Sequence, residues 1–191
     1  MVYRPAGMRE VETGRLLLRP PRVRDLDDWY REIGSDPEEM RWLATGNAIT
    51  RGEAAERFPW RWLELWERDG YGAWAVTLRG GGPLIGQCGV RLVDETKETE
   101  VLYAIGRSHQ GLGYATEAAR ASLRFGFELI GLERIVAYAR RDNERSIRVM
   151  EKLGMTFDRQ DRVFDLDVVV HATDRERFRL DDGPYEVRPS P

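Results

Sequence analysis

The fold of this chain is decided by residues 106–115, which read GRSHQGLGYA and open a long alanine-rich segment. The glycines predict a tight loop, and the alanines predict a helix directly after it. Small residues let backbone N–H groups converge on one concavity, and the positive end of the helix dipole faces the same point. The stretch therefore predicts a loop that binds phosphate groups.

The spacing within this loop separates three kinds of phosphate site. A P-loop requires Lys and then Ser or Thr after its second glycine, where this chain has Leu112 and Gly113. A dinucleotide-binding fingerprint requires a third glycine at Thr116, and it usually lies in the first strand-to-helix turn of its domain. Both are disfavoured. The third pattern is Gln or Arg, two residues, Gly, one residue, then Gly or Ala, and Gln110, Gly113 and Ala115 match it.

That third pattern resembles the acetyl-CoA pyrophosphate loop of the GCN5-related N-acetyltransferases. A second stretch is similar to the Asn-x-x-Ser-x-x-Val-x-Glu-Lys-Leu-Gly-Phe signature of the ribosomal-protein-alanine acetyltransferase subgroup. The first strand of that subgroup resembles residues 13–20, and the resemblance as a whole covers roughly residues 11–180. The residues that match the second signature are Asn143, Ser146, Val149, Glu151, Lys152, Leu153 and Gly154, with Met155 in place of the aromatic.

Length and charge limit the class of protein. The 191 residues suit one domain, which we expect at residues 11–180 between flexible tails at 1–10 and 181–191. The 30 basic and 33 acidic residues give a net charge of -3, which argues against a polycation that coats nucleic acid. No signal-peptide core and no apolar run near the roughly 18 residues of a membrane span are found. We therefore expect a soluble cytoplasmic protein without nucleic-acid or membrane partners.

The cysteine and histidine content predicts no metal site. Cys88 is the single cysteine, so an internal disulfide and a cysteine-based metal cluster are excluded. Its apolar neighbours indicate a buried strand residue rather than a reactive thiol. His109 and His171 have no metal-ligand partner at useful spacing.

Periodicity and breakers predict an α/β (α+β mixed) fold with a mixed, mostly antiparallel central sheet flanked by helices. Pro59 should kink the second helix or divide it, and a variable tryptophan-rich segment precedes that helix. Asn143 is expected as an N-cap and Gly154 as the left-handed residue after the last helix. The same order of elements is known for the acetyltransferase family. Strands are expected at 15–19, 71–78, 84–93, 99–105, 133–139, 157–160 and 166–173, and helices at 25–33, 52–68, 116–129 and 143–153.

The resemblance implies a binding site for acetyl-CoA as co-substrate, without a metal. The pantetheine arm would pair with the strand before the loop, and the pyrophosphate would bind the backbone N–H groups of the loop. Arg107, Arg145 and Arg148 are candidates for charge neutralisation, although each also fits a solvated face. The residues implied for the co-substrate are Leu102, Tyr103, Ala104, Ile105, Gln110, Gly111, Leu112, Gly113, Tyr114, Ala115, Thr116, Asn143, Ser146 and Arg148.

The resemblance also implies two catalytic residues. Glu100 matches a family glutamate that could take a proton from the amine, and the alternative is a solvated charge at a strand end. Ser146 matches a serine that could donate to the leaving thiolate, and the alternative is a helix serine that bonds the N-cap. Many relatives use a tyrosine where this chain has Met150, so the thiolate could also leave into solvent. Tyr103 resembles a family strand tyrosine but is expected in the core.

The sequence does not identify the acceptor substrate. The leading hypothesis is direct acetyl transfer to a protein N-terminal α-amine or a small-molecule amine. Trp42, Trp60, Trp62 and Trp66 occupy the region where relatives build the acceptor pocket, although such aromatics are usually core. One alternative is a non-catalytic acyl-CoA-binding module, and another is a donor such as succinyl-CoA, for which the sequence assigns no arginine. A homodimer is also left open.

Overall fold

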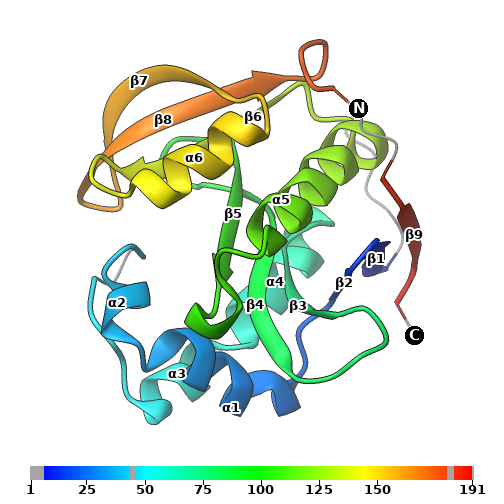
Figure 1. Cartoon of the computed structure of the whole chain (residues 1–191), viewed down its shortest axis with the longest axis vertical. Helices are drawn as coiled ribbons and strands as arrows, with labels where there is room; N and C mark the ends of the chain where they lie inside the picture. The colour runs from blue at the N-terminus through cyan, green and yellow to red at the C-terminus, as the bar shows by residue number, and fades with distance from the viewer. Residues whose placement is uncertain (1–6, 44–45, 180–182, 191) are drawn as a thin grey trace.

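A nine-stranded sheet runs through the computed structural model, which describes residues 7–43, 46–179 and 183–190 (Figure 1). Its strands are β1 Arg9–Thr13, β2 Leu16–Arg19, β3 Ala73–Leu78, β4 Leu84–Leu92, β5 Thr99–Ile105, β6 Arg134–Arg140, β7 Thr156–Val163, β8 Leu166–Asp174 and β9 Tyr185–Pro189. Their order across the sheet is β7-β8-β6-β5-β4-β3-β2-β1-β9. Every neighbouring pair is antiparallel except β5 and β6, which are parallel.

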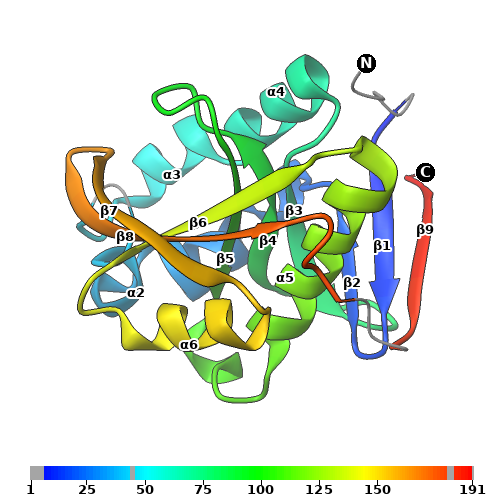
Figure 2. The same cartoon turned by 90° about the horizontal axis from the view of Figure 1, so that it is seen from above.

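Helices cover both faces of the sheet, as Figure 2 shows. The last two helices lie on one face, and the first four lie mainly on the other and around one end. The chain also forms 3-10 turns at Val23–Asp25 and Arg107–His109 and π-helical turns at Tyr30–Gly34 and Gly126–Ile130. The helices are α1 Leu26–Trp29, α2 Pro37–Met40, α3 Arg51–Arg57, α4 Trp60–Asp69, α5 Tyr114–Phe125 and α6 Glu144–Lys152.

Two hydrophobic clusters hold these layers together. The larger one packs α5 and α6 against the sheet, and its aromatic centre joins Trp66, Trp74 and Phe125 by edge-on contacts. The smaller one packs α1, α2 and α3 on the opposite face, where Trp29 stacks on Phe58 with ring centroids 5.3 Å apart. Cys88 is fully buried in the larger cluster, as predicted.

Most predicted elements are present, with shifted bounds. The predicted helix at 52–68 is divided, and α3 and α4 meet at Pro59. The helix predicted at 116–129 begins two residues earlier, at Tyr114. The strands predicted at 157–160 and 166–173 are β7 and β8, joined by a tight turn whose residues Phe164 and Asp165 have positive φ.

Strands lie within both of the segments expected as flexible tails, 1–10 and 181–191. Arg9 and Glu10 belong to β1, and β9 pairs antiparallel with β1 along its whole length. Side-chain contacts hold the added strand β9 in place. The Arg124 guanidinium carbon lies 4.2 Å from the centroid of the Tyr185 ring, and Val187 packs on the larger cluster. Residues 1–6, 180–182 and 191 lie outside the described residues.

The parallel pair, β5 and β6, has the fewest paired residues of any two neighbouring strands in the sheet. β4 and β5 pair over seven residues, from Gly86↔Ile105 to Leu92↔Thr99. β5 and β6 pair only at Glu100↔Val136, and the two strands diverge beyond that point (Figure 1). The edge of β5 after Glu100 is therefore left without a neighbouring strand, and the position of that edge depends on β4.

Substitution of Gly86 by alanine should destabilise the protein by about 1–3 kcal/mol. A Cβ at this position would collide with the backbone carbonyl of Ala104 and the side chain of Ile105, so β5 would have to move. Gly52→Ala is the matched control, because its Cβ would meet nothing closer than 3.8 Å and would favour helix α3. Urea denaturation of the three proteins measures the difference, and equal midpoints for Gly86→Ala and wild type would contradict the packing argument.

Candidate functional site

A cavity of about 800 Å³ opens where β5 and β6 diverge. Its walls come from α2, α3 and α4 on one side, from the loop at 106–113 and α5 on another, and from α6, β6 and the β7–β8 turn on the third. With the exception of Leu112, every residue that the sequence implied for catalysis or co-substrate binding lies on these walls. Leu112 is 54% exposed, and its side chain lies outside the wall.

The open edge of β5 offers backbone groups to this cavity. The Gly106 N–H donates to the Ile85 carbonyl at 2.9 Å. This bond identifies which residues of β5 direct their backbone groups toward β4. Because hydrogen-bonding direction alternates along a strand, the N–H and C=O groups of Tyr103 and Ile105 point away from β4, toward the opening. The Ile105 carbonyl accepts from Gln110 Nε2 at 2.8 Å, so the Tyr103 groups remain for a ligand.

The glycine loop offers a second set of backbone donors. Gly111 and Gly113 have φ of 76° and 82°, a left-handed conformation that glycine adopts without strain. Within the described residues, the N–H groups of 111–116 donate to no protein acceptor, as is usual in the first turn of a helix. These donors and the N-terminal dipole of α5 fit an anionic group such as a pyrophosphate.

An arginine and a glutamate far apart in sequence fix the loop in place. Arg15 Nη1 donates to the Leu112 carbonyl at 2.8 Å, and Arg15 Nε binds Glu117 Oε2 at 2.6 Å. Glu117 also accepts from Thr13 Oγ1 at 2.7 Å, which ties the first turn of α5 to the end of β1. Sequence reasoning missed this pair. The only local signal was an acidic residue in the first turn of the predicted helix.

The three arginines proposed for phosphate already bind partners within the protein. Arg107 pairs with Asp36 at 2.9 Å and holds the loop against α2. Arg145 Nη1 donates to Gln110 Oε1 at 3.0 Å, which links α6 to the loop across the opening. Arg148 pairs with Glu144 of its own helix at 3.3 Å. All three lie on the cavity rim, and the first two position the loop.

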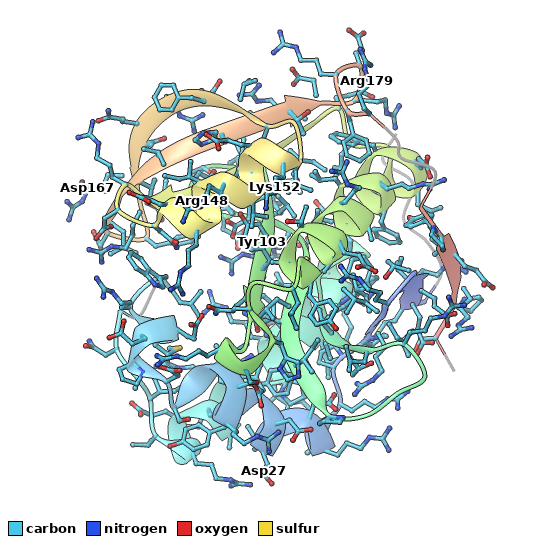
Figure 3. All side chains as sticks on the ribbon, in the orientation of Figure 1. Asp27, Tyr103, Arg148, Lys152, Asp167 and Arg179 are labelled. Atoms are coloured by element: carbon cyan, nitrogen blue, oxygen red, sulfur yellow. The ribbon has the colours of Figure 1, made fainter. Side chains whose placement is uncertain are left out.

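Tyr103 and Ser146 form a second link across the opening. Asn143 caps α6, and its Oδ1 accepts from the Ser146 N–H at 3.2 Å. The Tyr103 hydroxyl donates to the Ser146 carbonyl at 3.1 Å and lies 2.9 Å from Ser146 Oγ. Tyr103 lies next to α6, the helix that carries Arg148 and Lys152 (Figure 3). Burial raises the pKa of Tyr103, so its phenol stays protonated.

Glu100 is buried rather than solvated, because its exposed fraction is only 5%. Its Oε1 accepts from Arg91 Nε at 2.5 Å, and its Oε2 accepts no hydrogen bond from the described residues. Burial raises the pKa of this carboxyl, and the Arg91 guanidinium opposes the rise without cancelling it. Glu100 is therefore a carboxylate with one free oxygen and an increased affinity for a proton.

Aromatic side chains line the end of the cavity near Glu100. Trp62 and Phe164 lie on either side of Arg91, with 5.7 Å and 5.3 Å between its guanidinium and their ring centroids. Trp42 and Trp62 lie on the cavity wall. Trp66 belongs to the core instead, and Trp60 is 55% exposed and lies outside the wall.

Cys88 and His171 are buried, and His109 lies on the cavity wall. Cys88 is shielded by the core, and burial raises its pKa to about 12. His109 Nδ1 bonds Ser108 Oγ at 2.9 Å, and His171 is buried in β8. In the described part of the chain, no group of three or more potential ligands could hold a metal ion. Every helix described there is too short or too polar to span a bilayer.

Comparison with known proteins finds one family. The profile of the acetyltransferase (GNAT) domain matches residues 15–156. The YkkB protein of Bacillus subtilis is 30% identical over 165 residues, which cover 83% of this chain and 92% of YkkB. An acetyltransferase from Agrobacterium tumefaciens has a similar structure, with a TM-score of 0.74 and 29% identity over 91% of this chain and 97% of that one. RimJ of Mycobacterium smegmatis, solved in complex with CoA-disulfide, gives a TM-score of 0.70 and 25% identity over 89% and 87%.

The carboxyl of Glu100 should titrate at a higher pH than an ordinary glutamate, because burial raises its pKa more than Arg91 lowers it. Arg91→Gln should raise this pKa further. The raised pKa stabilises the folded state at low pH, and this contribution is lost as pH rises through the folded-state pKa. Carbon-detected NMR titration of the wild type and Arg91→Gln, with Arg68→Gln as control, measures the shift. A pKa in the ordinary range would contradict the dominance of burial.

Proposed function

The chain belongs to the GNAT acetyltransferase family, and from that premise we propose that it moves an acetyl group from acetyl-CoA to a primary amine by direct transfer in a ternary complex. The observation that carries the proposal is a single cavity that joins a set of unpaired loop N–H groups to a buried carboxylate with a free oxygen. The loop end fits the donor, and the carboxylate end fits an amine.

The donor site follows from backbone chemistry. The N–H groups of 111–116 at the start of α5 would bind the pyrophosphate, and the open edge of β5 at Tyr103 would pair with the pantetheine amides. Neither contact needs a particular side chain, so the backbone conformation of the loop would determine the specificity for coenzyme A. That RimJ of Mycobacterium smegmatis was solved with CoA-disulfide supports a coenzyme A site in this fold.

The acceptor chemistry requires a base. The neutral amine attacks the thioester carbonyl, an N–C bond forms, and the C–S bond breaks. Glu100 would take the proton that the amine loses, through Oε2, directly or through one water. Its raised pKa favours this role, because a base whose pKa lies closer to the working pH accepts the proton more readily.

The departing thiolate requires a proton donor. Met150, at the position of the tyrosine in many relatives, is 1% exposed and has no proton to give. Ser146 lines the cavity, and its Oγ would donate a hydrogen bond to the thiolate, which then takes its proton from solvent. The Tyr103 hydroxyl, 2.9 Å from Oγ, would hold the serine in place. The Asn143 cap of α6 binds the backbone N–H of Ser146, so the Ser146 hydroxyl is not required to cap the helix.

Glu100→Gln should lower kcat about 100-fold and leave the affinity for acetyl-CoA unchanged, because the base is lost and the donor site is intact. Thiol release from acetyl-CoA, measured across N-terminal peptides, amino acids, polyamines and aminoglycosides, identifies the acceptor class on which this is tested. Calorimetry measures acetyl-CoA affinity. Tight acetyl-CoA binding without turnover on any acceptor would instead support a non-catalytic binding module.

Ser146→Ala should lower kcat about tenfold without a change in acetyl-CoA affinity, because the leaving thiolate loses its donor. The folded helix should persist, since Asn143 still caps the backbone N–H. Tyr103→Phe is the matched variant, and it should reduce kcat less, because it removes only the contact that positions Ser146. If Ser146→Ala has wild-type kcat at every pH, the thiolate leaves without help from this hydroxyl.

A further inference from the structure

Two arginines at the Glu100 end of the cavity have no counter-ion. Arg57 ends α3 and Arg61 lies in the first turn of α4, and both line the cavity. Neither forms an ion pair or a hydrogen bond with any described residue. This differs from the arginines on the opposite rim, such as Arg107 and Arg145, which bind partners within the protein.

The charges near this pair act without direct contact. Arg91 pairs with Glu100, whereas Arg57 and Arg61 are exposed. The nearby carboxylates Glu53 and Glu64 act on them without forming ion pairs. Crowding by protein atoms lowers the pKa of Arg61, and its like-charged neighbours Arg91 and Arg57 lower it further. Glu64 acts on Arg61 from the next turn of α4 but forms no ion pair with it.

The carboxylate one helical turn before Arg57 is also occupied, although the charges of the two residues interact. Glu53 accepts from the backbone N–H of Thr50 at 2.7 Å and from its hydroxyl at 2.8 Å, in the capping box of α3. Like charges gathered in a partly enclosed site are unfavourable unless an anion joins them. The pair of arginines therefore remains available to an external ligand.

The surroundings select the kind of anion. Trp62, Phe58 and Phe164 line the same cavity, so the site combines apolar walls with guanidinium donors. Guanidinium groups bind carboxylates through paired charge-assisted hydrogen bonds, and aromatic walls pack against the apolar part of an organic anion. A small organic carboxylate fits this combination better than a hydrated inorganic ion.

We propose that Arg57 and Arg61 bind a carboxylate group on the amine acceptor, so that the substrate class is a carboxylate-bearing amine such as an amino acid or a short peptide. This inference rests on the proposed function, in which the acceptor approaches Glu100. The pair lies with Arg91 on the α3–α4 side, whereas Tyr103 and Ser146 lie on the α6 side of β5. A carboxylate on the acyl group, as in succinyl-CoA, is the other source of the same chemistry.

The first experiment compares acceptors that differ only in charge. Amino acids and dipeptides are assayed with acetyl-CoA against their C-terminal amides, for the wild type and the Arg57→Gln/Arg61→Gln double variant. Arg68→Gln is the control, because Arg68 lies on the same helix α4 but pairs with Asp69 and Asp94 outside the cavity. We expect kcat/KM to favour the acid about 10- to 100-fold in the wild type and control, and less than about threefold in the double variant.

Two outcomes of this assay would overturn the inference while the proposed function stands. One is turnover of amides at the same rate as acids, and the other is a preference for acids that survives in the double variant. A third arm replaces acetyl-CoA with succinyl-CoA. If the wild type prefers succinyl-CoA and the double variant loses that preference, the arginines bind the acyl group and the acceptor assignment is wrong.

A binding measurement keeps the test independent of turnover. Calorimetry is done with N-acetyl derivatives of alanine, leucine and phenylalanine, each as the acid and as the amide. The acids should bind the wild type at least about tenfold more tightly than the amides, the difference should shrink with added salt, and the double variant should lose it. Equal binding of acids and amides, or no binding of the acids, would refute the site even if no acceptor is acetylated.

Discussion

The rest of the structure depends on the single point at which β5 and β6 pair. A parallel ladder confined to Glu100↔Val136 lets the strands diverge, and each then leads into a helix that begins beside the opening. β5 runs into the glycine loop and α5, and β6 runs into the Asn143 cap and α6. One local break in the sheet therefore brings together an open strand edge, two helix starts and a buried carboxylate.

An opening within a sheet needs links that hold its sides at a fixed distance. Gln110 provides one, because its amide nitrogen binds the Ile105 carbonyl and its amide oxygen accepts from Arg145 of α6. The contact between Tyr103 and Ser146 provides another, deeper in the cavity. The Gln110 link takes up the Ile105 carbonyl, so the backbone groups of Tyr103 and the N–H groups of the loop remain for a ligand. The residues that hold the site open also form its walls.

Local chemistry explains which parts could be predicted from the sequence. Gly113 and Asn143 act within a few residues of themselves, through a left-handed turn and a helix cap, so their conformations followed from residue type. The order of the central elements followed from periodicity. The β1–β9 pair did not, because its strands lie at opposite ends of the chain. For the same reason, the loop clamp of Arg15 and Glu117 and the pairing of Glu100 with Arg91 required the folded structure.

The electrostatics of Glu100 link the proposed base to the proposed carboxylate site. Burial raises its pKa, and the Arg91 guanidinium lowers it, so the carboxyl responds to any change in the positive charge around it. Arg61 adds positive charge beside Arg91, and Arg57 adds more beside Arg61. A carboxylate bound to them would neutralise part of it and displace water, and both effects raise the pKa of Glu100. On this assignment the acceptor would strengthen the base that deprotonates it.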